Sequence, residues 1–255
     1  MNTTAPTLSI SVVSHGQMGL VSALLQDLAR CRRESDFELI LTLNVPEPEI
    51  PNPKDWPFAL RIVQNPRPLG FGANHNQALR RAQGDYFCVL NPDIRLPTNP
   101  WPALLAALQR EPLGVLAPLV LNAHGTVEDS VRRYPTPARL WAKLRGRRSG
   151  PDYTLNTALT RVDWVGGMFM VIPRSAYERV GGFDEGYFLY YEDVDLCARM
   201  NLAGLGVGVL REAQVIHNAQ RASHRHWAYL RRHVGSLLRY LRSDVYRQLR
   251  QRGCL

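Results

Sequence analysis

The stretch DYFCVLNPDIRL, residues 85–96, joins an apolar run to an abrupt polar stop. Residues 86–90 are mostly aromatic or aliphatic, which predicts a buried strand. Pro92 lacks an N–H and ends the strand, so Asp93 lies at its carboxyl edge. In an open α/β sheet this edge borders the ligand crevice, although Asn, Pro and Asp are also common in ordinary turns. The stretch therefore favours an α/β sheet with a candidate site at Asp93 and leaves a simple turn as the alternative.

Strand-like and helix-like segments alternate on both sides of this stretch, which predicts a mostly parallel sheet with flanking helices. The other predicted strands are residues 8–15, 38–44, 60–65, 115–122, 164–173 and 206–217. The predicted helices are residues 17–30, a segment ending near residue 83, and residues 100–110, 174–180 and 192–204. Asn99 is a candidate N-cap with Pro100 in the first helical position. Residues 123–160 show little periodicity, which is typical of a lid, a binding loop or a disordered segment.

The overall composition indicates a globular protein. With 255 residues, 45% of them hydrophobic, the chain can form one large α/β domain or two smaller ones. Its four cysteines lack the spacing of a zinc site or redox pair, which favours reduced thiols. The first residues do not resemble a signal peptide, and no stretch approaches the ~18 apolar residues that a spanning helix needs. We expect a cytoplasmic protein that is not integral to a membrane.

The net charge of +9 is concentrated in two places, residues 132–148 and the tail beyond residue 221. Such clusters suit phosphate-rich partners, which include nucleic acid, nucleotides and anionic membrane surfaces. A basic surface that only maintains solubility is the alternative. The chain contains no nucleic-acid-binding motif, so we expect no nucleic-acid partner.

Polar residues follow several predicted strands. Asp93 ends one strand, His217 ends the last, and Glu192 and Asp193 open a helix. Asp and His can bind Mg²⁺ or Mn²⁺, and Mg²⁺ usually completes its coordination with phosphate oxygens and water. A site with two protein ligands therefore implies a phosphorylated substrate, although His217 alone could equally be a structural histidine.

The segment GGFDEGYFLYY, residues 181–191, precedes Glu192 and Asp193. Its glycines and aromatic side chains beside a carboxylate suit a sugar ring and proton transfer from its hydroxyl. Helix capping by the two acids is the alternative. In LGFGANHNQAL, residues 69–79, the glycines precede a helix whose N–H groups could meet an anion, but the spacing matches neither a P-loop nor a dinucleotide fingerprint.

Five segments together resemble the family 2 glycosyltransferases, in particular the rhamnosyltransferase-like subgroup of bacterial polysaccharide biosynthesis. They are LGFGANHNQAL, LNPDIRL, SVRRYPT, the stretch from VGGMFM to MNLAG (residues 165–204) and AQVIH. The resemblance implies a GT-A fold, which is Rossmann-like, a dTDP- or UDP-sugar donor, a Mg²⁺ or Mn²⁺ ion and inversion at the anomeric carbon. It also implies a lipid-linked glycan or polysaccharide as acceptor.

The resemblance assigns metal binding to Asp93, the last acid of an Asp-any-Asp motif in its Asn-Pro-Asp form, and to His217. Asn91 replaces the first acid of that motif and can offer only a neutral oxygen. Asp193 matches the general base, and Glu192 would orient it or touch the acceptor.

The resemblance also places Gly72 and Asn76 in the turn near the donor. Two departures concern the nucleoside. The first strand ends in Ser14 and His15 rather than Thr-Tyr-Asn, and Asn44 stands where the second strand usually leads to an acid. We expect these three residues to bind the nucleoside differently or more weakly. A non-catalytic nucleotide-sugar or glycan-binding protein of GT-A fold is therefore the alternative function.

The basic tail predicts an amphipathic helix over residues 224–252, which divides the chain into a catalytic domain (1–223) and a C-terminal segment (224–255). Its apolar positions are Trp227, Leu230, Val234, Leu237, Leu238, Leu241, Val245 and Leu249. This face could bring the enzyme to the inner membrane as a peripheral protein. It could instead pack on the domain or on a second subunit in a homodimer.

Overall fold

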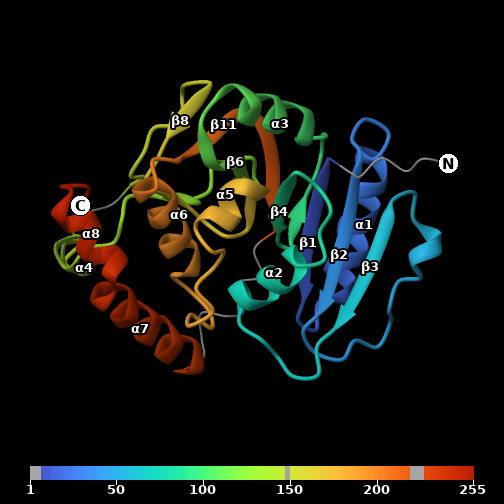
Figure 1. Cartoon of the computed structure of the whole chain (residues 1–255), viewed down its shortest axis with the longest axis horizontal. Coiled ribbons are helices and arrows are strands. Elements are labelled where there is room, and N and C mark those ends of the chain that lie inside the picture. Colours follow the sequence, from blue (N-terminus) through green and yellow to red (C-terminus); the bar gives the residue numbers. More distant parts are fainter. Residues whose placement is uncertain (1–6, 147–149, 219–226) are drawn as a thin grey trace.

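The computed structural model describes residues 7–146, 150–218 and 227–255. Within them, a mixed sheet of nine strands has the order β3-β2-β1-β4-β10-β6-β11-β5, with β8 paired to β11 (Figure 1). The strands are β1 (Leu8–Ser14), β2 (Phe37–Leu43), β3 (Ala59–Gln64), β4 (Tyr86–Leu90), β5 (Ile94–Arg95), β6 (Leu113–Asn122), β8 (Leu159–Arg161), β10 (Phe169–Pro173) and β11 (Gly206–His217).

Strands β3, β2, β1 and β4 pair in parallel, as do β6 and β11. Strand β10 lies between β4 and β6 and is antiparallel to both. The predicted α/β class with a mostly parallel sheet is therefore confirmed. The carboxyl ends of the parallel strands meet at one edge, where ligands bind in open α/β sheets.

Helices cover both faces of the sheet because its strands alternate their side chains. On β4, Cys88 and Leu90 join a core with α1 (Met18–Cys31) and α3 (Trp101–Arg110). Phe87 and Val89 point to the other core, which contains side chains of α2 (Phe71–Leu79), α5 (Arg174–Arg179) and α6 (Glu192–Leu202). Both cores contain several fully buried side chains, so the site rests on a rigid layer.

The structure differs from the sequence-based prediction in several places. Residues 164–173 form two strands, because a turn at Gly166 and Gly167 separates β9 (Trp164–Val165) from β10, and β9 pairs with β7 (Val131–Arg132). The irregular region also contains α4 (Pro137–Leu144), and a 3-10 turn, η1 (Pro53–Asp55), precedes β3. Helix α3 begins at Trp101 rather than Pro100, although Asn99 Oδ1 accepts a bond from the Trp101 N–H at 3.2 Å.

The C-terminal tail is two helices rather than one, α7 (Trp227–Arg242) and α8 (Asp244–Gln251). Ser243 separates them, because its Oγ accepts a hydrogen bond from the Tyr246 N–H at 3.1 Å and caps α8. Tyr240 and Leu249 are buried in a cluster with side chains of α6, so the tail packs on the sheet domain. The predicted boundary at residues 223 and 224 and the start of the predicted helix lie outside the described residues.

Among the described residues, no helix combines the length and hydrophobicity needed to cross a bilayer. The cysteines Cys31, Cys88, Cys197 and Cys254 are all free thiols, and the first three are buried.

Candidate active site

Two polar strand ends, Asp93 and His217, meet at the carboxyl edge of the sheet. Strand β5 follows Asp93 and pairs with the end of β11, with Ile94 opposite His217. The Asn218 N–H donates to the Asp93 carbonyl at 2.9 Å, and His217 Nε2 lies 3.1 Å from Asp93 Oδ2. Residues 124 positions apart are therefore held together by backbone pairing.

Glu128 is a third member of this group, and no motif or periodicity in the sequence points to it. It belongs to the segment after β6, in the region without periodicity, and its Oε2 lies 2.7 Å from His217 Nδ1. Burial alone would lower the pKa of His217, but hydrogen bonds with Asp93 and Glu128 raise it overall. A proton on Nδ1 shared with Glu128 would leave the Nε2 lone pair beside Asp93.

This group has the features of a cation site with few protein ligands. Asp93 Oδ1 is buried and lacks a hydrogen-bond partner among the described residues. A buried carboxylate oxygen without a partner is costly unless a ligand satisfies it. In the described part of the chain, no three acidic, His or Cys side chains are placed so that all of them could hold one metal ion. A Mg²⁺ or Mn²⁺ ion held by Asp93 and His217 with phosphate oxygens and water fits these donors.

A second acidic group, Glu192 and Asp193, begins α6. The two preceding residues, Tyr190 and Tyr191, have positive φ values of 72° and 70°. This left-handed conformation costs about 1–3 kcal/mol at each non-glycine residue, and such strain clusters at functional sites. The turn presents both acids at the first helical positions, where Glu192 is buried and Asp193 remains partly exposed.

The environments of these two carboxyls differ. Burial, and then the neighbouring Asp193, raises the pKa of Glu192 to about 8, and its Oε2 has no partner among the described residues. Burial also raises the pKa of Asp193, while the N–H groups of Val194 and Gly167, at 2.8 and 3.1 Å, act in the opposite direction. Burial therefore favours the neutral form of both carboxyls, while the N–H groups of Val194 and Gly167 favour the charged form of Asp193.

The turn at residues 166–168 joins these groups. The Gly166 N–H donates to the Ser130 carbonyl at 2.8 Å, two residues from Glu128. The next N–H, of Gly167, donates to Asp193, and the carbonyl of Met168 accepts a bond from the Asn91 N–H at 2.9 Å. Three consecutive residues thus contact the segments that carry Glu128, Asp193 and Asp93. A Cβ at Gly167 would lie 3.1 Å from the Phe71 ring, so the turn suits a small residue.

The residues expected to bind the nucleoside form a separate cluster at the ends of β1 and β2. Ser14 Oγ donates to the carboxylate of Glu47, which also accepts the N–H groups of Gly16 at 2.8 Å and Gln17 at 3.2 Å. Asn44 Nδ2 lies 3.2 Å from His15 Nδ1. Glu47 therefore places a carboxylate in this cluster three residues after Asn44, at a position that the sequence did not single out.

The side chain of Asn44 forms hydrogen bonds with other residues of the chain. Its Nδ2 donates to the Leu69 carbonyl at 3.0 Å, and its Oδ1 accepts bonds from the Leu69 N–H at 2.8 Å and from Asn65 Nδ2 at 2.9 Å. Asn65 also donates to Asn74 Oδ1 at 2.7 Å. This network fixes the loop before α2, so Asn44 has a structural role.

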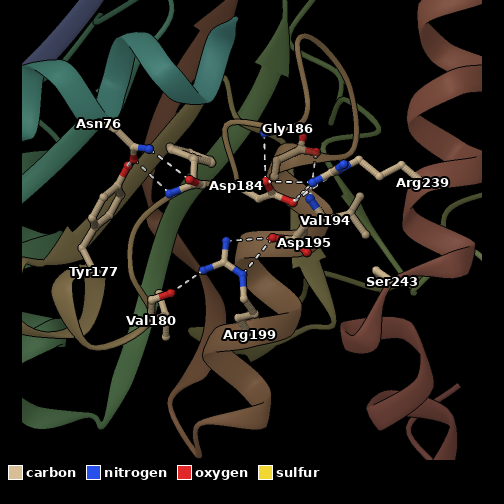
Figure 2. Close-up of polar contacts among 12 residues, drawn as sticks. Asn76, Tyr177, Val180, Asp184, Gly186, Val194, Asp195, Arg199, Arg239 and Ser243 are labelled. Carbon is tan, nitrogen blue, oxygen red and sulfur yellow. Dashed lines mark hydrogen bonds and ion pairs between the residues drawn. The ribbon is translucent and has the colours of Figure 1, made fainter.

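Gly72 and Asn76, which the resemblance places in the turn near the donor, contact the segment before α6. A Cβ on Gly72 would lie 2.6 Å from the Phe183 Cβ. Asn76 uses all four of its side-chain hydrogen-bonding positions: it donates to Phe183 O and Glu185 Oε1, each at 2.9 Å, and accepts from Phe183 N–H and Tyr177 OH at 3.0 and 2.7 Å (Figure 2). The structure thus supports a positioning role for both residues.

The fold and the acidic groups at the carboxyl edge of its sheet define the class, which is that of GT-A transferases that use nucleotide sugars. Comparison with known proteins then identifies the family. A model of "Glycosyl transferase family 2" matches residues 51–179, just over half of the chain. A second model, "N-terminal domain of galactosyltransferase", matches residues 155–225. The chain belongs to glycosyltransferase family 2 and is therefore a glycosyltransferase, which sets aside the non-catalytic alternative.

Two relatives are rhamnosyltransferases. The chain is 29% identical over 253 residues to rhamnosyltransferase WbbL of Escherichia coli K12, covering 91% of each chain. It is 33% identical over 187 residues to N-acetylglucosaminyl-diphospho-decaprenol L-rhamnosyltransferase of Mycobacterium tuberculosis, covering 65% of this chain and 61% of that protein. The rhamnosyltransferase-like resemblance seen in the sequence is confirmed.

Solved structures share the fold at low identity. GalNAc-T7 with UDP, GalNAc and Mn²⁺ aligns with a TM-score of 0.66 at 15% identity, covering 93% of this chain and 48% of that one. The mannosyltransferase PcManGT of Pyrobaculum calidifontis, in complex with GDP-Man and Mn²⁺, gives a TM-score of 0.60 at 16% identity, covering 93% and 65%. These similarities establish the GT-A sheet of the present chain.

Proposed function

We propose that this enzyme transfers rhamnose, with inversion, from a dTDP- or UDP-linked donor to a lipid-linked glycan in polysaccharide biosynthesis. One observation carries the proposal: the turn at residues 166–168 binds the three segments that carry Glu128, Asp93 and Asp193. A candidate cation site and a candidate base are thus tied to the same turn. The names of the two rhamnosyltransferase relatives support the sugar, and that of the mycobacterial relative supports a lipid diphosphate acceptor.

Asp93 and His217 are the residues that would hold a divalent cation on the donor diphosphate. Such a cation neutralises the negative charge that develops on a departing nucleoside diphosphate. Asn91 follows the same strand and could add a neutral oxygen. Glu128 holds His217 from the other side at 2.7 Å and would keep its Nε2 directed toward Asp93.

Asp193 is the group that would take the proton from the acceptor hydroxyl. It is partly exposed, whereas Glu192 is buried and retains its own proton near neutral pH. Burial raises the pKa of Asp193, and a carboxylate with a raised pKa is a stronger base than a fully solvated one. The Gly167 N–H at 3.1 Å from Oδ2 holds the carboxylate in place.

A donor screen followed by a transfer assay tests this function. The purified chain is mixed with dTDP- and UDP-sugars with and without Mn²⁺, and its melting temperature is measured. We expect dTDP-rhamnose to stabilise the protein only with Mn²⁺, and Asp93→Ala to remove this effect while the fold survives. Asp129→Ala, which removes an exposed acid near the crevice, is the matched control.

The same proteins are then assayed for transfer to polyprenyl-diphosphate-linked N-acetylglucosamine. We expect wild-type transfer that stops in excess EDTA and a wild-type rate for the control variant. Unchanged transfer in EDTA would contradict the cation site. Turnover of another donor sugar alone would contradict the assignment of rhamnose.

A further inference from the structure

Helix α7 packs on the domain through one face. Ser236 Oγ donates to the Leu189 carbonyl at 2.9 Å, and Tyr240 is fully buried. Arg239 forms an ion pair with Asp184 at 2.8 Å (Figure 2), and its guanidinium lies against Gly186, where a Cβ would collide with it. This face therefore holds the segment that leads to Glu192 and Asp193.

A second apolar strip on α7 remains uncovered. Leu230, Val234 and Leu238 recur every four residues and so share one side of the helix. They are 54%, 45% and 43% exposed, among the most exposed large hydrophobic side chains in the described residues. Leu237 and Leu241, by contrast, pack against the buried cluster of Tyr240. The sequence predicted one apolar face, and the structure divides it into a packed part and a free part.

Basic residues border the free strip. Arg231 lies seven residues before Leu238 and Arg242 lies four residues after it, so helical periodicity places both beside the strip. Neither has an acidic partner within 4.0 Å among the described residues. The sequence of α7 contains no Asp or Glu at all.

We propose that the strip of Leu230, Val234 and Leu238, with Arg231 and Arg242, docks on an anionic lipid bilayer. The apolar side chains would enter the headgroup region while the guanidinium groups meet lipid phosphates. A second copy of the chain fits less well, because paired α7 helices would bring cations together without a single carboxylate from either helix. The net charge of +9 favours the same partner.

This surface also gives the proposed function a location. The packed face of α7 contacts Asp184 and Leu189, and His233 lies with its ring 5.3 Å from that of Tyr191, next to Glu192. A bilayer under the free strip would therefore lie near the side where a lipid-linked acceptor enters. The need for such an acceptor rests on the proposed function, whereas bilayer binding itself does not.

Vesicle co-sedimentation of the full chain tests the docking surface. Phosphatidylcholine vesicles with and without phosphatidylglycerol are used at low and high salt. We expect binding to the anionic vesicles that weakens at high salt.

Arg231→Gln with Arg242→Gln should weaken this binding about 20- to 30-fold, since each basic residue contributes roughly fivefold at modest salt. Leu230→Ser, Val234→Ser and Leu238→Ser together should weaken it roughly 100-fold, because about half of each side chain is still available for burial.

Ile50→Ser is the matched control, because Ile50 is 55% exposed and belongs to the loop between β2 and β3, at the opposite end of the molecule from α7 (Figure 1). Its vesicle binding should equal that of the wild type. Thermal melts of every variant verify the fold, and light scattering reports the oligomeric state.

Equal or negligible vesicle binding of wild type and variants would overturn the proposal. A wild-type dimer that the triple serine variant converts to a monomer, without vesicle binding, would assign the strip to a second copy instead. Loss of vesicle binding with intact transfer to a soluble acceptor would separate this surface from the proposed catalytic function.

Discussion

The two sides of the candidate site differ in how their polar side chains are hydrogen-bonded. At the ends of β1 and β2, the side chains of Ser14 and Asn44 are bonded to other parts of the chain. At the end of β4 and the start of α6, Asp93 and Glu192 each keep one buried oxygen that has no partner among the described residues. A buried polar atom without a partner costs about 1–3 kcal/mol, so it marks a place where a ligand can be stabilised.

The first side, which we call the amide side, includes Asn44, Asn65 and Asn74 and fixes the loop before α2. It too has a buried oxygen without a partner among the described residues, Asn65 Oδ1, but that oxygen belongs to a neutral amide. On the second, the carboxylate side, the unpartnered oxygens belong to acids whose charged form is costly to bury. Removing a residue should therefore lower stability on the amide side, and on the carboxylate side it should impair chemistry and can raise stability.

Asp193→Asn should have the largest effect. The amide keeps the shape and the bond from the Gly167 N–H but cannot accept the proton of the acceptor hydroxyl. Transfer should fall ~10²- to 10⁴-fold, while donor affinity stays near that of the wild type. Steady-state transfer rates and donor titration measure the two effects, and Asp55→Asn, an exposed acid in η1, serves as the control. Wild-type transfer by Asp193→Asn would place the base elsewhere and leave Asp193 as a residue of the helix start.

Glu192→Gln should stabilise the protein. The pKa of Glu192 is raised from 4.5 to about 8, so the folded protein binds a proton more tightly than the unfolded chain between these pH values. Wild-type stability therefore falls as pH rises through this window, and the uncharged variant avoids that loss. The gain should be near zero below pH 4.5 and on the order of 4 kcal/mol at pH 8.

Urea unfolding at pH 4.5, 6 and 8 measures this gain, with Glu212→Gln as an exposed control that should show none. A gain that is independent of pH would mean that Glu192 is not a buried, charge-penalised carboxyl. The carboxylate side would then lose the property that distinguishes it from the amide side.

Glu128→Gln should have a smaller effect, which is on the affinity for the divalent cation. The variant weakens the partner that holds His217 at 2.7 Å, and loss of such outer partners typically lowers metal affinity about 10- to 100-fold. Calorimetric titration of Mn²⁺ in the presence of dTDP measures this directly and needs no turnover. Mn²⁺ affinity equal to that of Glu212→Gln would show that Glu128 does not position His217.

The site residues that the sequence predicts are those that lie at the ends of regular hydrophobic patterns. Asp93 and His217 each end an apolar strand, and Asp193 starts an amphipathic helix, so local pattern places all three at the sheet edge. The parallel order of β1 to β4 follows from the alternation of strands and helices. These features depend on neighbours a few residues away.

The rest depends on contacts between distant segments. Glu128 meets His217 across 89 positions, and Glu47 meets Ser14 across 33, both from loops without periodicity. Asn76 forms hydrogen bonds with residues 101 to 109 positions away, which its motif does not indicate. No local pattern reports such pairings. The break in the C-terminal tail at Ser243 was missed because the apolar spacing continues across it.

Ser14→Ala should have the smallest effect and the opposite sign to Glu192→Gln. The variant removes the bond from Ser14 Oγ to Glu47, but the N–H groups of Gly16 and Gln17 still hold that carboxylate at 2.8 and 3.2 Å. Loss of one such bond costs about 1 kcal/mol, or about 2–4 °C in melting temperature for a chain of this size. Because Ser14 is buried and already paired, Mn²⁺ affinity and donor affinity should both stay within about twofold of wild type, a difference worth less than ~0.5 kcal/mol. Urea unfolding measures the stability, and titrations with Mn²⁺ and with the donor measure the two affinities. A tenfold loss of donor affinity at unchanged stability would identify Ser14 as a donor-binding residue.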